Sequence, residues 1–187
     1  MKLIKRHSYL DRLCNVRGTP DIKIIVGVRR GGKSKLLESF RDLLSLDSGV
    51  NIIYIDLSDL VNERLLEYHA LNDYVLSNTK DGVENVLMVD EVQECKGFER
   101  TINSLHNSGK YDIYLTGSNA FLLSSDLATL FTGRQIEIPV YPFSFAKIRD
   151  AYPRMLIART RNPETDFEGV RIVNLADWLS GVGVDLQ

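Results

Sequence analysis

Residues 22–34, IKIIVGVRRGGKS, contain the change of pattern that decides the fold. The segment begins with an apolar run that only Lys23 interrupts, which is typical of a strand buried on both faces. Glycines then follow, and they allow the tight backbone curvature of a loop. The leucines and phenylalanine after the loop are spaced as one face of a helix: Leu36, Leu37, Phe40, Leu43 and Leu44. The stretch therefore predicts a strand, a glycine-rich loop and an amphipathic helix.

The loop fits the phosphate-binding pattern G-x-x-x-x-G-K-[ST], also called Walker A. In such a loop, backbone N–H groups and the start of the following helix face phosphate oxygens. Lys33 would contact the β- and γ-phosphates, and Ser34 would bind Mg²⁺. The predicted nucleotide-binding residues are Gly27, Val28, Arg29, Arg30, Gly31, Gly32, Lys33 and Ser34. Whether the two arginine side chains contact phosphate, solvent or a partner is left open.

Alternating strands and helices along the chain predict an α/β fold. We expect strands at 22–28, 51–57, 86–89, 113–115 and 136–140. We expect helices at 33–46, in part of 60–77, at 98–106 and at 143–151. Buried parallel strands joined by crossovers need helices on both faces. The prediction is a three-layer α/β/α P-loop NTPase fold with a parallel sheet in the order 5-1-4-3-2.

Paired acids end the third predicted strand, in the sequence VLMVDE at residues 86–91. Because side chains alternate along a strand, Asp90 and Glu91 would point in different directions. Asp90 is predicted to bind Mg²⁺ (Walker B), and Glu91 to act as the general base that activates water. Without a phosphate loop upstream, two acids that merely end a surface strand would be the better interpretation.

Two further candidate groups follow the third strand. The fourth strand ends in small polar residues, and Ser118 or Asn119 would contact the attacking water or the γ-phosphate as a sensor. Asn119 has the alternative role of capping the next helix. Arg134 precedes the fifth strand and is a candidate donor to phosphoryl oxygens, on this subunit's nucleotide or on a neighbour's. A surface arginine without a catalytic role is the alternative.

The composition is that of an ordinary globular protein, with 187 residues, 44% hydrophobic residues and a net charge of −2. Apolar runs are too short to span a bilayer, and the basic N-terminus lacks the apolar segment of a signal peptide. With only two cysteines, we expect a cytoplasmic protein without disulfides and without membrane contact.

The small net charge conceals a strong asymmetry along the chain. Residues 1–41 hold 11 Lys/Arg against 3 Asp/Glu, whereas residues 42–94 hold 2 against 12. The basic segment suits a nucleic acid or a small polyanion. The alternative is that the basic and acidic segments pair with each other in the folded protein.

Four sequence blocks together resemble one protein family. They are IKIIVGVRRGGKSKLL, VLMVDEVQECKGFE, YLTGSNAFLLSSDLATLFTGR and YPFSF, with an entry segment around Tyr9, Leu10 and Leu13. The chain resembles bacterial and archaeal AAA+-like ATPases in which this domain precedes a restriction-endonuclease-like domain. The resemblance implies ATP and Mg²⁺ as cofactors, Asp90 and Glu91 as the hydrolytic pair, and Ser118 and Asn119 as the sensor. Lys35 departs from the Thr or Val that is usual after the loop serine.

The tail suggests a second domain that is largely missing. Residues 154–181 resemble the last strands and helix of the endonuclease-like domain, so we expect an ATPase domain at 1–150 and a remnant at 151–187. The remnant is predicted to be a strand pair, 155–158 and 170–173, joined by a polar loop at 161–168 and followed by a helix at 175–179. A tail this short lacks a nuclease core, so no nuclease activity is expected.

The predicted function is Mg²⁺-dependent hydrolysis of ATP to ADP and phosphate. Two alternatives are a nucleotide-dependent binding switch with little turnover and a truncated remnant that has lost its role. A GTPase is disfavoured because the guanine-reading sequence N-K-x-D is missing. A small-molecule kinase is disfavoured by Glu91 and by the lack of an arginine-rich lid. A DNA or protein partner and self-association are left open.

Overall fold

The computed structural model describes residues 7–117, 131, 133–141, 154–158, 165–167 and 170–174. The chain divides into two units, Met1–Pro142 and Phe143–Gln187, and each is described by itself. In the parts of the chain so described, no helix has the length and apolar character needed to cross a membrane.

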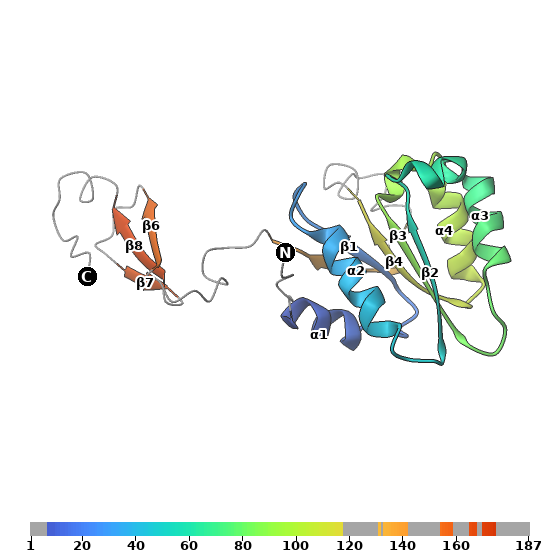
Figure 1. The fold of residues 1–187 in the computed structure, drawn as a ribbon, viewed down its shortest axis with the longest axis horizontal. Coiled ribbons are helices and arrows are strands. Elements are labelled where there is room, and N and C mark those ends of the chain that lie inside the picture. Colours follow the sequence, from blue (N-terminus) through green and yellow to red (C-terminus); the bar gives the residue numbers. More distant parts are fainter. Residues whose placement is uncertain are drawn as a thin grey trace. The chain divides into compact units, whose positions relative to one another are not determined.

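A parallel sheet forms the centre of the first unit (Figure 1). Its strands are β1 (Ile22–Val26), β2 (Val50–Asp56), β3 (Glu84–Asp90), β4 (Tyr111–Thr116) and β5 (Gln135–Pro139). They are arranged in the order β2-β3-β4-β1-β5, and each neighbouring pair is parallel. Read from the other edge, this is the predicted order 5-1-4-3-2, which is confirmed. The carboxyl ends of β1, β3 and β4 therefore meet at one edge of the sheet.

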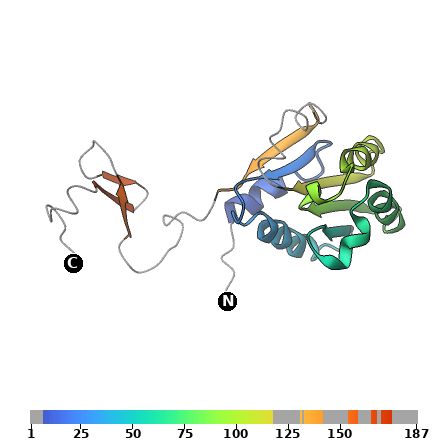
Figure 2. The same ribbon diagram turned by 90° about the horizontal axis from the view of Figure 1, so that it is seen from above.

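Helices cover both faces of this sheet, which makes the three predicted layers (Figure 2). One face is covered by α1 (His7–Asn15) and α2 (Lys33–Leu44). The other is covered by α3 (Tyr68–Ser77), α4 (Phe98–Asn107) and the 3₁₀ helices η1 (Leu60–Leu65) and η2 (Val92–Glu94). The three-layer α/β/α fold is thus confirmed. The α1 helix was not predicted as a helix.

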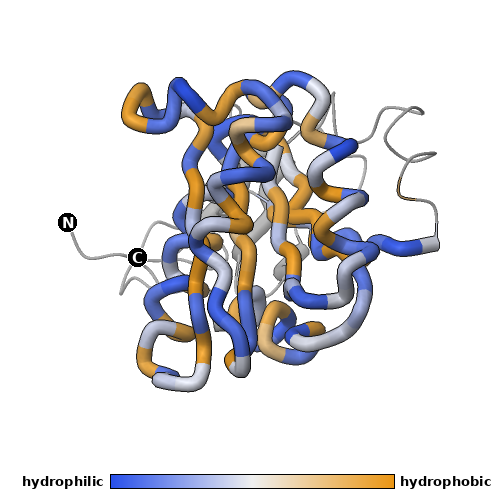
Figure 3. Tube along the Cα trace, turned by 90° about the vertical axis from the view of Figure 1, so that its right-hand side faces the viewer, coloured by the Kyte–Doolittle hydropathy of each residue, from blue (hydrophilic) through white to orange (hydrophobic). Residues whose placement is uncertain are grey.

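Each face of the sheet has its own hydrophobic core, and β1 contributes to both because its side chains alternate between the two faces. Ile24 packs in the core with α3 and α4, whereas Ile25 packs in the core with α1 and α2. Both side chains are almost fully buried. The same doubly buried pattern makes the strands long apolar runs in Figure 3. The two cysteines differ in burial: Cys14 is exposed, and Cys95 is buried in the core with α4.

The second unit contains a small sheet. Its strands are β6 (Arg154–Ala158), β7 (Thr165–Phe167) and β8 (Val170–Asn174), in the order β6-β8-β7. The first and last correspond to the predicted strand pair and run parallel to each other, while β7 is antiparallel to β8. The β7 segment was expected to be a loop, because a three-residue strand has too little alternation to recognise. The helices predicted at 143–151 and 175–179 lie outside the described residues.

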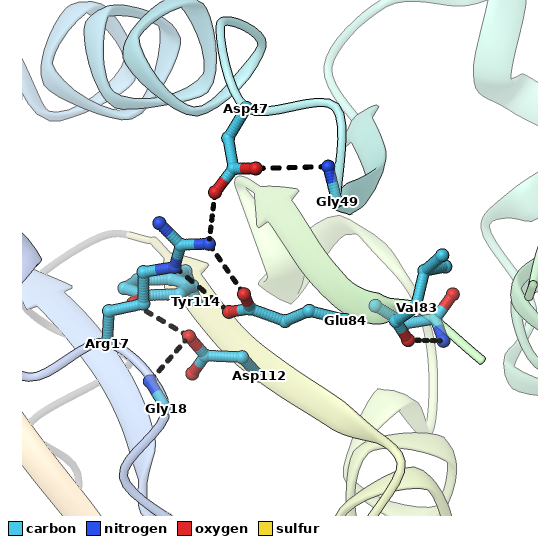
Figure 4. Close-up of polar contacts among 9 residues, drawn as sticks. Arg17, Gly18, Asp47, Gly49, Val83, Glu84, Asp112 and Tyr114 are labelled. Atoms are coloured by element: carbon cyan, nitrogen blue, oxygen red, sulfur yellow. Dashed lines mark hydrogen bonds and ion pairs between the residues drawn. The ribbon is translucent and has the colours of Figure 1, made fainter.

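A buried ion pair anchors the amino-terminal edge of the main sheet. Lys23 Nζ donates to Asp112 Oδ1 at 2.5 Å, and both side chains are almost fully buried. The other carboxylate oxygen, Asp112 Oδ2, accepts from the Gly18 amide and the Tyr114 hydroxyl, each at 3.0 Å (Figure 4). Burial and the neighbouring carboxylate raise the pKa of Tyr114. The pair joins β1 to β4, and the Gly18 contact ties the loop before β1 to both.

A second ionic contact at the same edge accounts for part of the charge asymmetry. The Arg17 guanidinium donates from Nε and Nη2 to the two Glu84 carboxylate oxygens, at 3.0 and 2.6 Å (Figure 4). It also contacts Asp47 at 3.2 Å. Hydrogen bonding to Glu84 raises the pKa of Arg17. Part of the basic segment is therefore paired within the fold, as one of the two interpretations expected.

We expect that breaking the buried pair will destabilise the first unit. Lys23→Met and Asp112→Asn each leave one charged group buried without its partner, which costs about 3–5 kcal/mol. The double variant should lose less than the sum of the two, because no unpaired charge is left. Chemical denaturation measures the free energy of unfolding.

The exposed pair of Lys35 with Glu38 provides the control. Lys35→Ala should change the free energy of unfolding by less than about 1 kcal/mol. A loss in Asp112→Asn that is no larger than in this control would contradict the structural role assigned to the pair.

Candidate functional site

The candidate site lies at the carboxyl edge of the main sheet, where β1, β3 and β4 end. Ligands of open α/β sheets bind at this edge, in the crevice beyond the strand ends. The phosphate-binding pattern occupies the turn from β1 to α2, and the paired acids lie at the end of β3.

Backbone geometry curls the loop ahead of α2. Arg30 and Gly32 have φ values of 62° and 86°, in the left-handed region, and the Gly31 amide donates to the Val28 carbonyl at 2.9 Å. Gly32 is the N-cap of α2, and no side chain caps the first N–H groups of this helix. The helix start therefore presents its amides without a capping side chain, as an anion-binding site requires.

Two loop glycines are required by close backbone approach. A Cβ atom on Gly27 would lie 2.3 Å from the Val140 carbonyl oxygen, and one on Gly31 would lie 2.9 Å from the Val28 oxygen. Val140 follows β5, and its amide donates to the Val26 carbonyl at 2.7 Å. The backbone at Val140, directly after β5, thus packs against the phosphate-binding loop.

The loop holds the side chain of Lys33 by its own carbonyl groups. Lys33 Nζ donates to the Gly27 oxygen at 3.0 Å and to the Val28 oxygen at 3.3 Å. The side chain is buried, with 5% of the residue exposed. A phosphate group in the loop would compete with these carbonyls for the ammonium group, and it would offer the full negative charge that they lack.

A network of hydroxyl groups surrounds Asp90. The residue is buried, and its carboxylate accepts a hydrogen bond from Thr116 Oγ1. Burial raises the pKa of Asp90, and the neighbouring Asp56 raises it further, while the nearby hydroxyl groups of Thr116 and Ser34 lower it. Asp56 lies beside Asp90 in the register of β2 and β3. The structure thus brings the predicted metal-binding residues, Ser34 and Asp90, close together.

Thr116 is a candidate site residue that the sequence analysis missed. Its hydroxyl donates to Asp90 and accepts from the Glu91 amide at 3.1 Å, and the residue is fully buried. The available signal was a threonine as the last residue of the fourth strand, next to the third strand in the predicted order. One side chain of β4 therefore orients both acids.

Glu91 has a strained backbone at the end of β3. Its φ and ψ are 52° and 50°, in the left-handed region, which costs a non-glycine residue about 1–2 kcal/mol. Its Oε2 atom accepts from Gln93 Nε2 at 2.6 Å. Such strain is concentrated at functional sites, where surrounding contacts hold it in place.

The donors at this edge suit a magnesium ion. The Asp90 carboxylate and the Ser34 hydroxyl are hard oxygen ligands, and Mg²⁺ in nucleotide sites is held by one or two protein groups together with phosphate oxygens and water. Within residues that the structure describes, no cluster of three or more His, Cys, Asp or Glu side chains could hold a metal alone.

The remaining predicted residues are placed as follows. Arg29 and Arg30 are exposed on the loop. Arg134 is exposed before β5, beside the start of β1, and its Nη1 contacts Asn107 Oδ1 at 3.4 Å. It is therefore at the edge of the sheet opposite to the loop, away from the other candidate residues. Ser118 and Asn119 lie outside the described residues.

The sequence is similar to a family model and to proteins of other organisms. A family model described as "AAA domain" matches residues 19–149. An uncharacterized protein of Haemophilus influenzae is 36% identical over 152 residues, which are 80% of this chain and 38% of the relative. An uncharacterized protein of Methanocaldococcus jannaschii is 32% identical over 155 residues, which are 78% of this chain and 32% of the relative. The chain thus spans about a third of the length of these relatives.

A solved structure shows the same fold. Cdc6p from Pyrobaculum aerophilum matches with a TM-score of 0.51 and 14% identity, over 73% of this chain and 45% of that one. At this identity the match supports the three-layer architecture alone.

Because burial raises the pKa of Asp90, we expect its ionised carboxylate to reduce stability. Asp90→Asn removes the buried charge and keeps the shape of the side chain, so at pH 8 this variant should be at least as thermally stable as the wild type. The difference should shrink as the pH falls through the raised pKa, because Asp90 then takes up a proton in the wild type. Thermal unfolding followed by circular dichroism from pH 8 to pH 5 measures this.

Asp73→Asn, on the exposed side of α3, is the matched control and should show no such trend. If Asp90→Asn were less stable at pH 8, with a gap that widened toward pH 5, the assigned effect of burial would be wrong.

Proposed function

From the premise that this chain belongs to the AAA domain family, we propose that it binds ATP with Mg²⁺ and hydrolyses it to ADP and phosphate. The observation that carries the proposal is that Ser34, at the start of α2, lies close to the buried carboxylate of Asp90, at the end of β3. A phosphate-binding loop thus lies beside a buried carboxylate, which are the two parts that a magnesium nucleotide requires.

Binding would begin at the loop and at Lys33. The amides from Gly27 to Ser34 would surround the phosphates, and the uncapped start of α2 would favour their negative charge. Lys33 would exchange its carbonyl contacts for phosphate oxygens, which needs only a rearrangement of its side chain within the loop.

Metal binding would depend on Ser34 and Asp90. Mg²⁺, when bound, supplies positive charge that neutralises the phosphate oxygens. Ser34 would offer its hydroxyl oxygen as a ligand, and Asp90 would orient the metal from its buried position. Thr116 would keep the Asp90 carboxylate in place by the hydrogen bond that it already donates.

Glu91 would activate the attacking water. Its carboxylate would take a proton from the water as the water oxygen forms a bond to the γ-phosphorus, while the bond to the β,γ-bridging oxygen breaks and ADP leaves. The backbone position of Glu91 is set by the hydrogen bond from its amide to Thr116. Arg134 lies at the opposite edge of the sheet, so a part in this step would be on a neighbouring molecule's nucleotide, and this role stays a prediction.

A second candidate function is a nucleotide-dependent switch with little turnover. One observation favours it: the backbone that packs against the loop is the chain that leaves β5 toward residue 143, where the second unit begins. A nucleotide that rearranges the loop would act directly on this connection. A DNA or protein partner and self-association are left open, and the absence of nuclease activity in the tail stays a prediction.

Steady-state ATPase and nucleotide-binding assays test the proposal. Lys33→Ala should lower ATP affinity at least tenfold, because the buried ammonium is lost. Glu91→Gln should bind ATP within about twofold of the wild type and hydrolyse it about 10²–10⁴-fold more slowly. The assays are run with and without DNA, and stimulation by DNA would support a nucleic-acid partner.

Lys35→Ala, on an exposed side chain of α2, is the matched control for the loss of a lysine and should leave both measurements unchanged. A wild type that hydrolyses ATP no faster than Lys33→Ala would refute the enzymatic proposal. ATP binding without turnover in the wild type would favour the switch.

A further inference from the structure

We propose that Gln93 is a positioning residue that holds the Glu91 carboxylate for its work on water. This inference rests on the proposed ATP hydrolysis and adds a residue to it. Gln93 lies two positions after Glu91, in the 3₁₀ helix η2, and is partly buried.

The contact between the two side chains is short and directed. Gln93 Nε2 donates to Glu91 Oε2 at 2.6 Å, and it lies 3.4 Å from Glu94 Oε1. An amide group carries two N–H donors, so one can serve each carboxylate. A hydrogen bond to an ionised oxygen is about twice as strong as one between neutral groups. The short hydrogen bond to Glu91 is therefore the one that holds Gln93, and the contact with Glu94 is longer and weaker.

Glu91 needs such a contact because its backbone alone does not fix its carboxylate. The strained φ and the amide bond to Thr116 set the direction in which the side chain leaves the strand. Beyond Cα, the side chain still has three rotatable bonds, and ordering it costs conformational entropy. A general base must lie within hydrogen-bond reach of the proton that it removes. The hydrogen bond from Gln93 would order the Glu91 side chain before water and nucleotide bind.

The chemistry of an amide fits this task better than that of a cation would. Asp90 and Glu94 add negative charge near Glu91, and an arginine or lysine would be attracted to the same place. A cation bound to Glu91 would stabilise the ionised carboxylate and so weaken it as a base. Gln93 donates a hydrogen bond to one oxygen without adding formal charge. The other carboxylate oxygen keeps its lone pairs for the proton of water.

Gln93→Ala tests the proposal in the full chain. We expect kcat to fall about tenfold while the dissociation constant for ATP stays within twofold, because Gln93 acts through Glu91 and not on the phosphates. In a Glu91→Gln background the same substitution should have no further effect on kcat, since the base that it positions is already lost. Glu94→Gln keeps the short contact and is the matched control, with kcat expected within twofold.

Three results would overturn the inference. The first is an unchanged kcat in Gln93→Ala. The second is an increased kcat in this variant, which would mean that Gln93 restrains Glu91. The third is an equal fall of kcat in the Glu91→Gln background, which would indicate a purely structural effect. If one of these results is found while the wild type still hydrolyses ATP in a way that requires Lys33 and Glu91, the inference about Gln93 is wrong and the proposed function stands. A wild type without such turnover refutes both.

A second readout does not depend on turnover. The side-chain amide of Gln93 gives a pair of resonances in a ¹⁵N correlation spectrum, which Gln93→Ala identifies by their loss. These resonances should shift strongly in Glu91→Ala and only slightly in Glu94→Gln. Resonances that do not respond to Glu91→Ala would show that the contact is not made in solution, whatever the ATPase result.

Discussion

The groups gathered around Asp90 connect the parts of the first unit on which its chemistry depends. Ser34 lies close to the carboxylate at the start of α2, and Thr116 donates a hydrogen bond to it from the end of β4. Thr116 also receives the amide of Glu91, so one hydroxyl controls both acids. The contacts require β1, β3 and β4 to end at the same edge, which their parallel pairing guarantees. Any slip in register would separate the phosphate-binding loop from its acids.

Charged side chains are paired at the amino edge of the sheet, whereas like charges lie next to each other at the carboxyl edge. At the amino edge, Lys23 and Asp112 satisfy each other, and Arg17 joins Glu84, so that edge is neutralised within the fold. At the carboxyl edge, Asp56 and Asp90 lie side by side in the register of β2 and β3. Their mutual repulsion favours any cation that binds between the loop and the sheet. The fold is thus stabilised at one edge and prepared for a charged ligand at the other.

The sequence predicted the strands and helices that have a clear hydrophobic periodicity. It did not predict features that depend on which strands lie side by side, or elements that are only a few residues long. Doubly buried strands and the loop glycines were recognisable, because burial and backbone curvature restrict the residue types allowed. The role of Thr116 was not, because it depends on β4 lying against β3. The position of Arg134 required the register of β5 on β1. The α1 helix has nine residues, so its buried leucines, Leu10 and Leu13, span too few turns for the periodicity to be recognised.

The different burial of the two cysteines supplies a reporter already built into the chain. Cys14 is exposed, whereas burial raises the pKa of Cys95 to about 12 and shields its sulfur. An alkylating reagent at neutral pH would modify Cys14 in the folded protein and reach Cys95 only after local opening. Cys95 directly follows η2, the segment that carries Gln93. The rate at which Cys95 is modified would therefore measure how often this layer opens, and whether nucleotide slows that opening.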